Sequence, residues 1–216
     1  MGRTGSDSAD SDQGGVVASD GADVPLTMPG AVAYLQAHRS DLRGLPPERV
    51  AAAYTEIITR EWTEMRPFLP AEAETVLDVG CGAGLLAAHL AARYSGAAVH
   101  LLDGDGPPTA CSGWQEGSPT PSTSREVVEA LFQAHGLPAP TWIDPHRPVA
   151  LHADFVLSTL SWGFHYPLRV YPEITAHAAL LDIRVGQEAE ALARFGPPTR
   201  SIQEHPKYHR WLWNGP

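Results

Sequence analysis

One short segment of the chain combines residue types suited to holding a nucleotide-like ligand. After an apolar run, an acid and three glycines occupy every second position, as Asp78, Gly80, Gly82 and Gly84, with Cys81 inside the turn. Glycine accepts the positive φ of a tight turn and has no Cβ to block a ligand. A helix that begins after such a turn presents unpaired N–H groups to the ligand. The segment therefore predicts a strand, a ligand-binding turn and a helix.

A second acid follows the next apolar run. Residues 99–103 read Val-His-Leu-Leu-Asp, which predicts a strand with Asp103 at its end and Gly104 directly after it. In a doubly wound sheet an acid about 20 residues beyond the glycine turn reaches the ribose of a bound nucleotide. Asp103 is therefore the predicted ribose ligand, with Gly104 beside it. The alternative is an ordinary acidic turn over residues 103–106, because Asp-Gly is common turn chemistry.

The spacing of the glycines separates two classes of cofactor. A dinucleotide-binding turn follows the pattern Gly-x-Gly-x-x-Gly or Ala. Counted from Gly80, the third position of that pattern is Leu85, so this register fails. Counted from Gly82 the pattern is met at Ala87, but Asp78 is then left without a role. The pattern Asp-x-Gly-x-Gly-x-Gly, which uses every residue of the turn, resembles the first motif of class I S-adenosylmethionine-dependent methyltransferases.

That resemblance implies a fold, a cofactor and further contacts. The fold is a Rossmann-like α/β fold of class I methyltransferases, with a seven-stranded, mostly parallel sheet, helices on both faces and a C-terminal antiparallel hairpin. The implied cofactor is S-adenosyl-L-methionine. In this fold the acid at the tip of the third strand, here Asp144 after residues 141–143, typically reaches the adenine amino group. Asp-Pro is also a plain turn signal, which is the alternative for Asp144.

The chemistry is expected just beyond the fourth strand, predicted at Ala153 to Leu160, where open α/β sheets place their ligands. Residues 161–167 read Ser-Trp-Gly-Phe-His-Tyr-Pro there, and Ser158 precedes them as a further expected cofactor contact. Methyl transfer is an in-line displacement, and a hydroxyl or amine acceptor favours a nearby base. His165 is the candidate base, because imidazole titrates near neutral pH, and Tyr166 is the candidate for orienting the acceptor. A structural role is the alternative for a lone histidine.

The same segment resembles a narrower group of proteins. Residues 157–167, with Tyr171 and residues 181–184, are similar to small methyltransferase-like proteins of phages and bacteria, some labelled sugar O-methyltransferases. The resemblance spans about residues 75–211 and departs at residues 104–124, where this chain carries prolines and small residues. We therefore expect methyl transfer to a small molecule, with a hydroxyl of a sugar or natural product as the acceptor. A nicotinamide-dependent oxidoreductase, a cofactor-binding domain without turnover and other sulfonium chemistry remain alternatives.

The remaining elements have to position this site. Helices are predicted near Pro29 to Ser40, at Pro47 to Arg66 and from about Ser124 to Gly136. Tyr54 and Trp62 belong to an aromatic face of the second helix, which is typical of core packing, with a cofactor lid as the alternative. Later elements are predicted as a strand at Leu180 to Val185, a helix at Gln187 to Phe195, and antiparallel strands at Thr199 to Glu204 and Tyr208 to Trp213.

Composition and length bound the organisation of the chain. A chain of 216 residues with 43% hydrophobic residues is long enough for one domain with an ample core. We expect residues 1–24 to be a disordered acidic tail and residues 25–216 to be one methyltransferase-like domain, with residues 25–70 as a helical lid. The long segment 104–124 predicts a substrate-side flap or, alternatively, a tolerated surface insertion.

Charge and cysteine content exclude several classes of partner. A net charge of -10 argues against nucleic acid as a partner, because phosphate backbones are bound by clustered Lys and Arg. The sequence predicts no membrane span, and its two cysteines predict neither a disulfide framework nor a zinc site, which favours a cytoplasmic location. No metal is expected: His205 and His209 straddle Pro206 rather than sharing a helix face. Loosely bound magnesium at Asp154 or Asp182 remains open.

Overall fold

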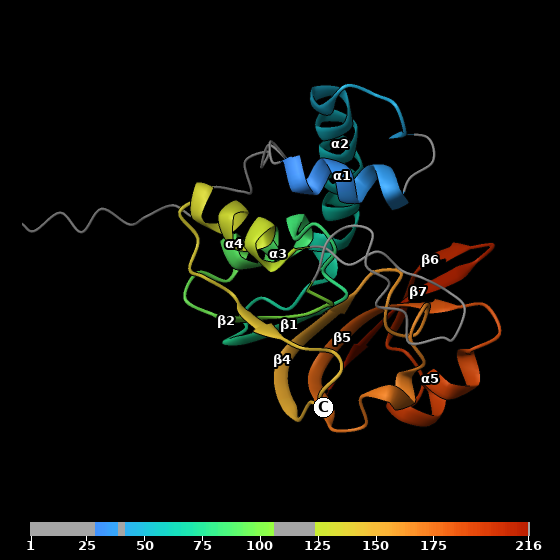
Figure 1. The fold of residues 1–216 in the computed structure, drawn as a ribbon. Helices are drawn as coiled ribbons and strands as arrows, with labels where there is room; N and C mark the ends of the chain where they lie inside the picture. The colour runs from blue at the N-terminus through green and yellow to red at the C-terminus, as the bar shows by residue number, and fades with distance from the viewer. Residues whose placement is uncertain (1–28, 39–41, 106–123, 216) are drawn as a thin grey trace, which may run out of the picture.

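The computed structural model describes residues 29–38, 42–105 and 124–215 (Figure 1). A single twisted sheet lies at the centre, with helices packed on both of its faces. The expected acidic tail at residues 1–24 lies outside the described residues, as does most of the expected flap. Both therefore stay predictions from the sequence.

The sheet has seven strands in the order β3-β2-β1-β4-β5-β7-β6. Strands β1 to β5 pair in parallel, whereas β7 runs antiparallel to both β5 and β6. This topology confirms the predicted Rossmann-like sheet with its C-terminal antiparallel hairpin. The strands are β1 (Thr75–Val79), β2 (Ala98–Leu102), β3 (Thr141–Ile143), β4 (Leu151–Ser158), β5 (Ile174–Arg184), β6 (Arg200–His205) and β7 (Tyr208–Asn214).

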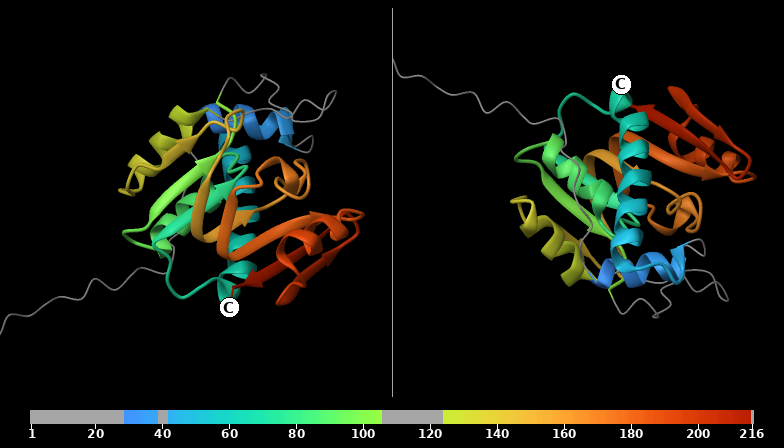
Figure 2. Two further views of the ribbon diagram at one scale, coloured as in Figure 1. Left: turned by 90° about the horizontal axis from the view of Figure 1, so that it is seen from below. Right: turned by 90° about the horizontal axis from the view of Figure 1, so that it is seen from above.

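The helices form two unequal layers around the sheet (Figure 2). One face is covered by α2 (Pro47–Met65), α3 (Leu85–Arg93) and α4 (Arg125–Ala134), and their apolar side chains form one core with it. On the other face α5 (Glu188–Phe195) and the 3-10 turn η3 (Leu168–Val170) contribute to a second core. In the described parts of the chain, every helix is too short or too polar to span a lipid bilayer.

The N-terminal helix α1 (Pro29–His38) packs against the first half of α2 rather than against the sheet. Ala31 and Leu35 of α1 share a small core with Val50 of α2, with Ala83 of the glycine turn and, at its margin, with Val127 of α4. The 3-10 turn η2 (Arg66–Phe68) ends α2. Helix α1 thus lies next to the glycine turn.

Several strand boundaries differ from the predicted ones by one or more residues, and two of these differences have a clear physical reason. β5 begins at Ile174, six residues before the expected start, because its first half is half-exposed, with Thr175 and His177 facing solvent between smaller residues. Pairing with β4, from Leu151 opposite Ile174, extends the strand where apolar periodicity is weak. β4 ends at Ser158, two residues early, because the backbone turns sharply at Leu160, whose φ is 53°.

Candidate functional site

The glycine turn joins β1 to α3 at the carboxyl edge of the sheet (Figure 1). Gly80, Gly82 and Gly84 have φ values of 78°, 55° and 80°, which glycine adopts at little energetic cost. From β1 the chain continues to β2 and β3 on one side, and then crosses to β4 on the other side of β1, so the strand order reverses at this point. Open α/β sheets bind their ligands at this switch point.

Two of the three glycines are required by packing within the protein. A Cβ on Gly80 would lie 1.9 Å from the hydroxyl oxygen of Ser161, in the loop that follows β4. A Cβ on Gly84 would lie 2.6 Å from a methyl carbon of Val128 on α4. Both distances are far below van der Waals contact, so any side chain at these positions forces the neighbouring element to move. The turn is therefore closely packed on both sides.

Gly82 instead faces the hydroxyl of Tyr34, a residue that sequence reasoning missed. The hydroxyl oxygen lies 2.8 Å from the position that a Gly82 Cβ would take. Burial raises the pKa of Tyr34 well above its usual value, and the charge of Asp103 and the neighbouring Tyr54 raise it further. The available signal was a single tyrosine in a helix of mostly small and aliphatic residues.

The carboxylate of Asp103 ties the end of β2 to the glycine turn. Its Oδ2 accepts the backbone N–H of Gly82 at 2.8 Å, and its Oδ1 accepts that of Gly104 at 2.7 Å. Burial raises the pKa of Asp103 to about 6, although these two hydrogen bonds act in the opposite direction. The thiol of Cys81 also lies 3.8 Å from Oδ2. Asp103, Gly104 and Cys81 are thus gathered around Gly82.

Asp78 is a second acid beneath the same turn. It lies near the end of β1, level with Leu101 of β2 and Leu157 of β4, and is only 3% exposed. Burial, with a smaller contribution from the charge of Asp103, raises the pKa of Asp78 to about 8. Two acids therefore share one poorly solvated site, which favours a ligand that brings hydrogen-bond donors or positive charge.

The loop after β4 is organised around the backbone carbonyl of Ser161. This oxygen accepts the N–H groups of Phe164 at 3.0 Å, His165 at 2.7 Å and Tyr166 at 2.9 Å. Because the Ser161 side chain also packs on Gly80, the loop that carries both candidate catalytic residues is anchored to the glycine turn. This contact joins two parts of the site that are 81 residues apart in the sequence (Gly80 and Ser161).

The two candidate catalytic side chains have contrasting environments. His165 is exposed, whereas Tyr166 is only 8% exposed and lies close enough to Asp103 for its charge to act on the phenol. Burial, and then Asp103, raise the pKa of Tyr166 to about 12. The phenol is therefore neutral near pH 7 and suited to donating a hydrogen bond.

Ser158 and Asp144 have local partners that explain their positions. The hydroxyl of Ser158 is fully buried, donates to the carbonyl of Val79 at 2.8 Å and accepts the N–H of Trp162 at 2.7 Å. That geometry joins β1 to the loop after β4 and leaves no exposed surface for a cofactor. Asp144 is exposed, accepts the N–H of His146 at 2.9 Å and pairs with Arg147 at 3.3 Å. This is the arrangement of the plain turn alternative.

The groups considered for metal binding are engaged by the chain itself. Among the described residues, no three His, Cys, Asp or Glu side chains converge on a possible metal position. His209 lies on β7 between the carboxylates of Glu204 and Glu188, with 3.2 Å to the latter. Asp182 is neutralised by Arg210, as described below. Magnesium at Asp182 is therefore disfavoured by a competing cation that is part of the protein.

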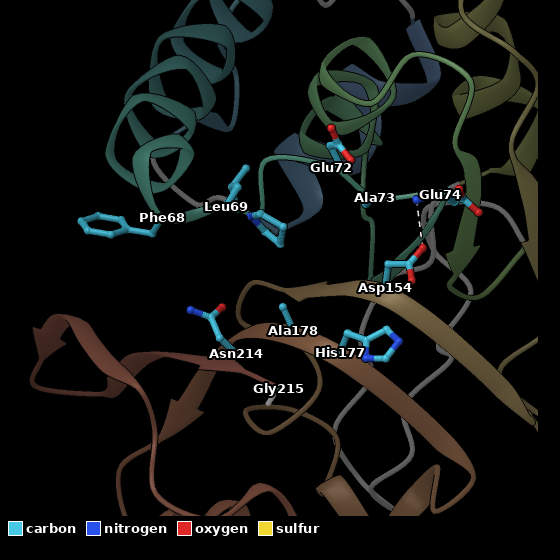
Figure 3. Close-up of a pocket in the computed structure, with 11 residues that line it drawn as sticks. Phe68, Leu69, Glu72, Ala73, Glu74, Asp154, His177, Ala178, Asn214 and Gly215 are labelled. Atoms are coloured by element: carbon cyan, nitrogen blue, oxygen red, sulfur yellow. Dashed lines mark hydrogen bonds between the residues drawn. The ribbon is translucent and has the colours of Figure 1, made fainter.

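A separate hollow of about 550 Å³ lies at the opposite, amino-terminal edge of the parallel strands (Figure 3). There Asp154 accepts the N–H groups of Glu74 and Thr75, both at 2.9 Å, and so fixes the start of β1 against β4. This occupies the second carboxylate considered for magnesium. The hollow is lined on its apolar side by Phe68, Leu69 and Ala178 and on its polar side by Glu72, Asp154 and His177.

Comparison with protein-family models gives one relevant match. Residues 65–115 match the model described as Methyltransferase small domain, which is about a quarter of the 216 residues. The matched segment includes the glycine turn and Asp103. No curated protein matches the chain.

Several solved structures are similar to this chain at low sequence identity. Coclaurine N-methyltransferase, solved with N-methylheliamine and SAH, is 18% identical with a TM-score of 0.41, over 69% of this chain and 42% of that enzyme. Magnesium protoporphyrin IX methyltransferase from Synechocystis PCC 6803, solved with SAM, is 16% identical with a TM-score of 0.47, over 87% of this chain and 91% of that enzyme. The pyocyanin biosynthetic protein PhzM is 14% identical with a TM-score of 0.47, over 84% of this chain and 68% of that protein. The chain spans less than half the length of the first of these.

Replacing Gly80 with alanine tests the close packing of the turn. Gly80→Ala should lower the free energy of unfolding by about 1–3 kcal/mol more than Gly44→Ala, because only the former pushes a neighbouring residue away. Gly44 is a matched control, since its φ of 76° equals that of Gly80 within 2° and no atom lies within 4 Å of an added Cβ. Urea unfolding measures both. Equal losses would mean that Ser161 does not pack on Gly80.

The two buried acids predict a pH dependence of stability. Their pKa values in the folded protein, about 8 for Asp78 and about 6 for Asp103, exceed that of an unfolded aspartate. The stability they contribute is present below about pH 4 and is lost as the pH rises toward 8, by up to about 1.4 kcal/mol per pH unit for each group. Urea unfolding at pH 5.5 and 8.5 should show this fall, and Asp78→Asn should remove most of it. An equal fall in the stability of the variant would assign the pH dependence to groups other than Asp78.

Proposed function

We propose that this chain binds S-adenosylmethionine at the glycine turn and transfers its methyl group to a small-molecule acceptor. The observation that carries the proposal is the link between Asp103 and Gly82, 2.8 Å long, at the switch point of the sheet. The match of residues 65–115 to a methyltransferase domain model supports the same reading. The nicotinamide alternative would leave Asp78 unexplained.

The residues of the turn fit such a cofactor. Oδ1 of Asp103 accepts the backbone N–H of Gly104 and keeps a lone pair for a ribose hydroxyl. Oδ2 accepts the N–H of Gly82 and the weaker S–H donor of Cys81. The space beside Gly82, now lined by the Tyr34 hydroxyl, can receive the cofactor if that side chain turns aside. The nearby acid Asp78 favours a positively charged ligand. We propose that α1 and α2 act as the lid over this ligand.

The chain's own residues would align the acceptor and handle its proton. When bound, S-adenosylmethionine supplies a methyl group on a positively charged sulfur. His165, exposed in the loop anchored by Ser161, would take the proton of an acceptor hydroxyl or amine. Tyr166, whose phenol keeps its proton near pH 7, would donate a hydrogen bond that orients the acceptor oxygen.

The acceptor we propose is a hydroxyl of a sugar or other small natural product. The acidic chain, with a net charge of -10, disfavours polyanionic acceptors such as nucleic acids. Tyr34 and Tyr166 both lie near enough to Asp103 for its charge to raise their pKa values, and Tyr54 and Tyr166 also act electrostatically on Tyr34. Phenol groups combine an apolar ring with a hydrogen-bonding tip, which suits a small acceptor with both characters.

Parallel calorimetric titrations with S-adenosylmethionine, S-adenosylhomocysteine and NAD test the cofactor. We expect the first two to bind and NAD not to bind. Asp103→Ala should weaken the binding of S-adenosylhomocysteine by about 5- to 150-fold, which corresponds to about 1–3 kcal/mol for a lost charged acceptor. Asp105→Ala is the matched control, because Asp105 is an exposed acid two residues further on. Binding of NAD alone would contradict the proposal and favour a nicotinamide-dependent oxidoreductase.

The base role of His165 is tested once a screen of hydroxyl compounds with labelled S-adenosylmethionine yields an acceptor. His165→Ala should lower kcat by about 10²- to 10⁴-fold near neutral pH while leaving S-adenosylhomocysteine affinity unchanged. His146→Ala, which alters another exposed histidine beside the third strand, should keep the wild-type rate. A wild-type rate in the His165 variant would give this histidine a structural role.

A further inference from the structure

A fully buried ion pair lies on the side of β4 away from the glycine turn. Asp182 of β5 and Arg210 of β7 are opposite each other in the antiparallel register and are 0% and 1% exposed. The guanidinium binds the carboxylate through two hydrogen bonds, Nε to Oδ1 at 2.7 Å and a terminal nitrogen to Oδ2 at 2.9 Å. Burying such a pair is often no more stabilising than an apolar pair of similar size, so stability alone explains it poorly.

The same carboxylate makes a third hydrogen bond that leaves the pair. Its Oδ2 accepts the backbone N–H of Leu160 at 3.1 Å, across from β5 to the end of β4. Among the described residues, Leu160 is the one non-glycine residue with a positive φ, at 53°. That conformation costs a leucine about 1–2 kcal/mol. Because the Leu160 side chain is 40% exposed, burial of the leucine offsets little of this cost.

The residue after this strained turn is Ser161. Its side chain fills the space beside Gly80, and its carbonyl accepts the N–H groups of the loop that carries His165 and Tyr166. The direction in which the chain leaves Leu160 therefore decides where Ser161 lies. A chain of direct contacts thus runs from the ion pair, through the turn, to both parts of the proposed active site.

We propose that Asp182 and Arg210 are positioning residues that hold the Leu160–Ser161 turn in its strained conformation. In doing so they fix the glycine turn from one side and set the place of the loop that carries the candidate base. The pair acts through the backbone and touches neither cofactor nor acceptor. This inference rests on the proposed function for its binding readout, but its structural core does not need a ligand.

The first test compares S-adenosylhomocysteine affinity in two Asp→Asn variants. Asp182→Asn should weaken binding by about tenfold, because the turn loses a charged acceptor and Ser161 is no longer held against Gly80. Asp154→Asn is the matched control, since Asp154 also accepts backbone N–H groups between two strands, but at the opposite edge of the sheet (Figure 3). The control should bind as the wild type does, whatever it loses in stability.

A rescue separates positioning from general stabilisation. Glycine adopts a φ near 53° without strain, so Leu160→Gly should restore affinity in the Asp182→Asn background to within about threefold of wild type. Conversely, Leu160→Val leaves the ion pair in place but resists the left-handed conformation, and it should weaken binding as Asp182→Asn does. Because Leu160 is exposed, this variant should fold even if Asp182→Asn does not.

Amide hydrogen exchange of the protein without ligand gives the second readout. Exchange over residues 158–166 and 80–84 should speed up in Asp182→Asn and Leu160→Val but not in Asp154→Asn, and Leu160→Gly should reverse the effect of Asp182→Asn. Wild-type exchange and affinity in both Asp182→Asn and Leu160→Val, or failure of the glycine rescue, would overturn the positioning role. If the wild type binds no S-adenosylhomocysteine, the proposed function fails while the exchange data still decide this inference.

Discussion

The contact between Ser161 and Gly80 is the constraint on which the rest of the site depends. Gly80 lies at the end of β1, and Ser161 follows the end of β4, so their contact joins the two central strands just beyond the sheet. The buried hydroxyl of Ser158, bonded to Val79 and Trp162, makes a second link between the same segments. The absence of a Cβ at Gly80 is therefore what allows the glycine turn and the loop after β4, the two halves of the proposed site, to meet.

The site combines this tight packing with unfavourable electrostatics. Asp78 and Asp103 are poorly solvated acids, and their raised pKa values express the cost of charging them in the folded chain. A ligand with positive charge and hydroxyl donors would relieve that cost, so the same feature that lowers stability favours binding. Proteins commonly accept such a local loss of stability where it serves function. The turn at Leu160 is a second instance, in which the cost comes from the positive φ of the backbone rather than from a buried charge.

The sequence predicted those parts of the fold and site that depend on local patterns. The glycine turn, the acid after β2 and the terminal hairpin each have a compact signal in residue type and spacing, and the structure has all three. The missed features depend on partners distant in sequence. Tyr34 meets Gly82 only after α1 has packed, and Asp182 meets Leu160 and Arg210 only when three strand ends are brought together. No periodicity encodes such pairings.

The residues of the proposed site come partly from inside and partly from outside the segment that matches a family model. The segment that matches a family model, residues 65–115, holds the glycine turn and Asp103, which form the proposed cofactor side. Tyr34 and Tyr166, together with the buried pair behind the Leu160 turn, come from outside that segment. A cofactor corner does not dictate the reaction built upon it. If the proposed function holds, we expect the choice of acceptor to depend on the loop after β4 and on the N-terminal helices, whose geometry is set by the contacts described above.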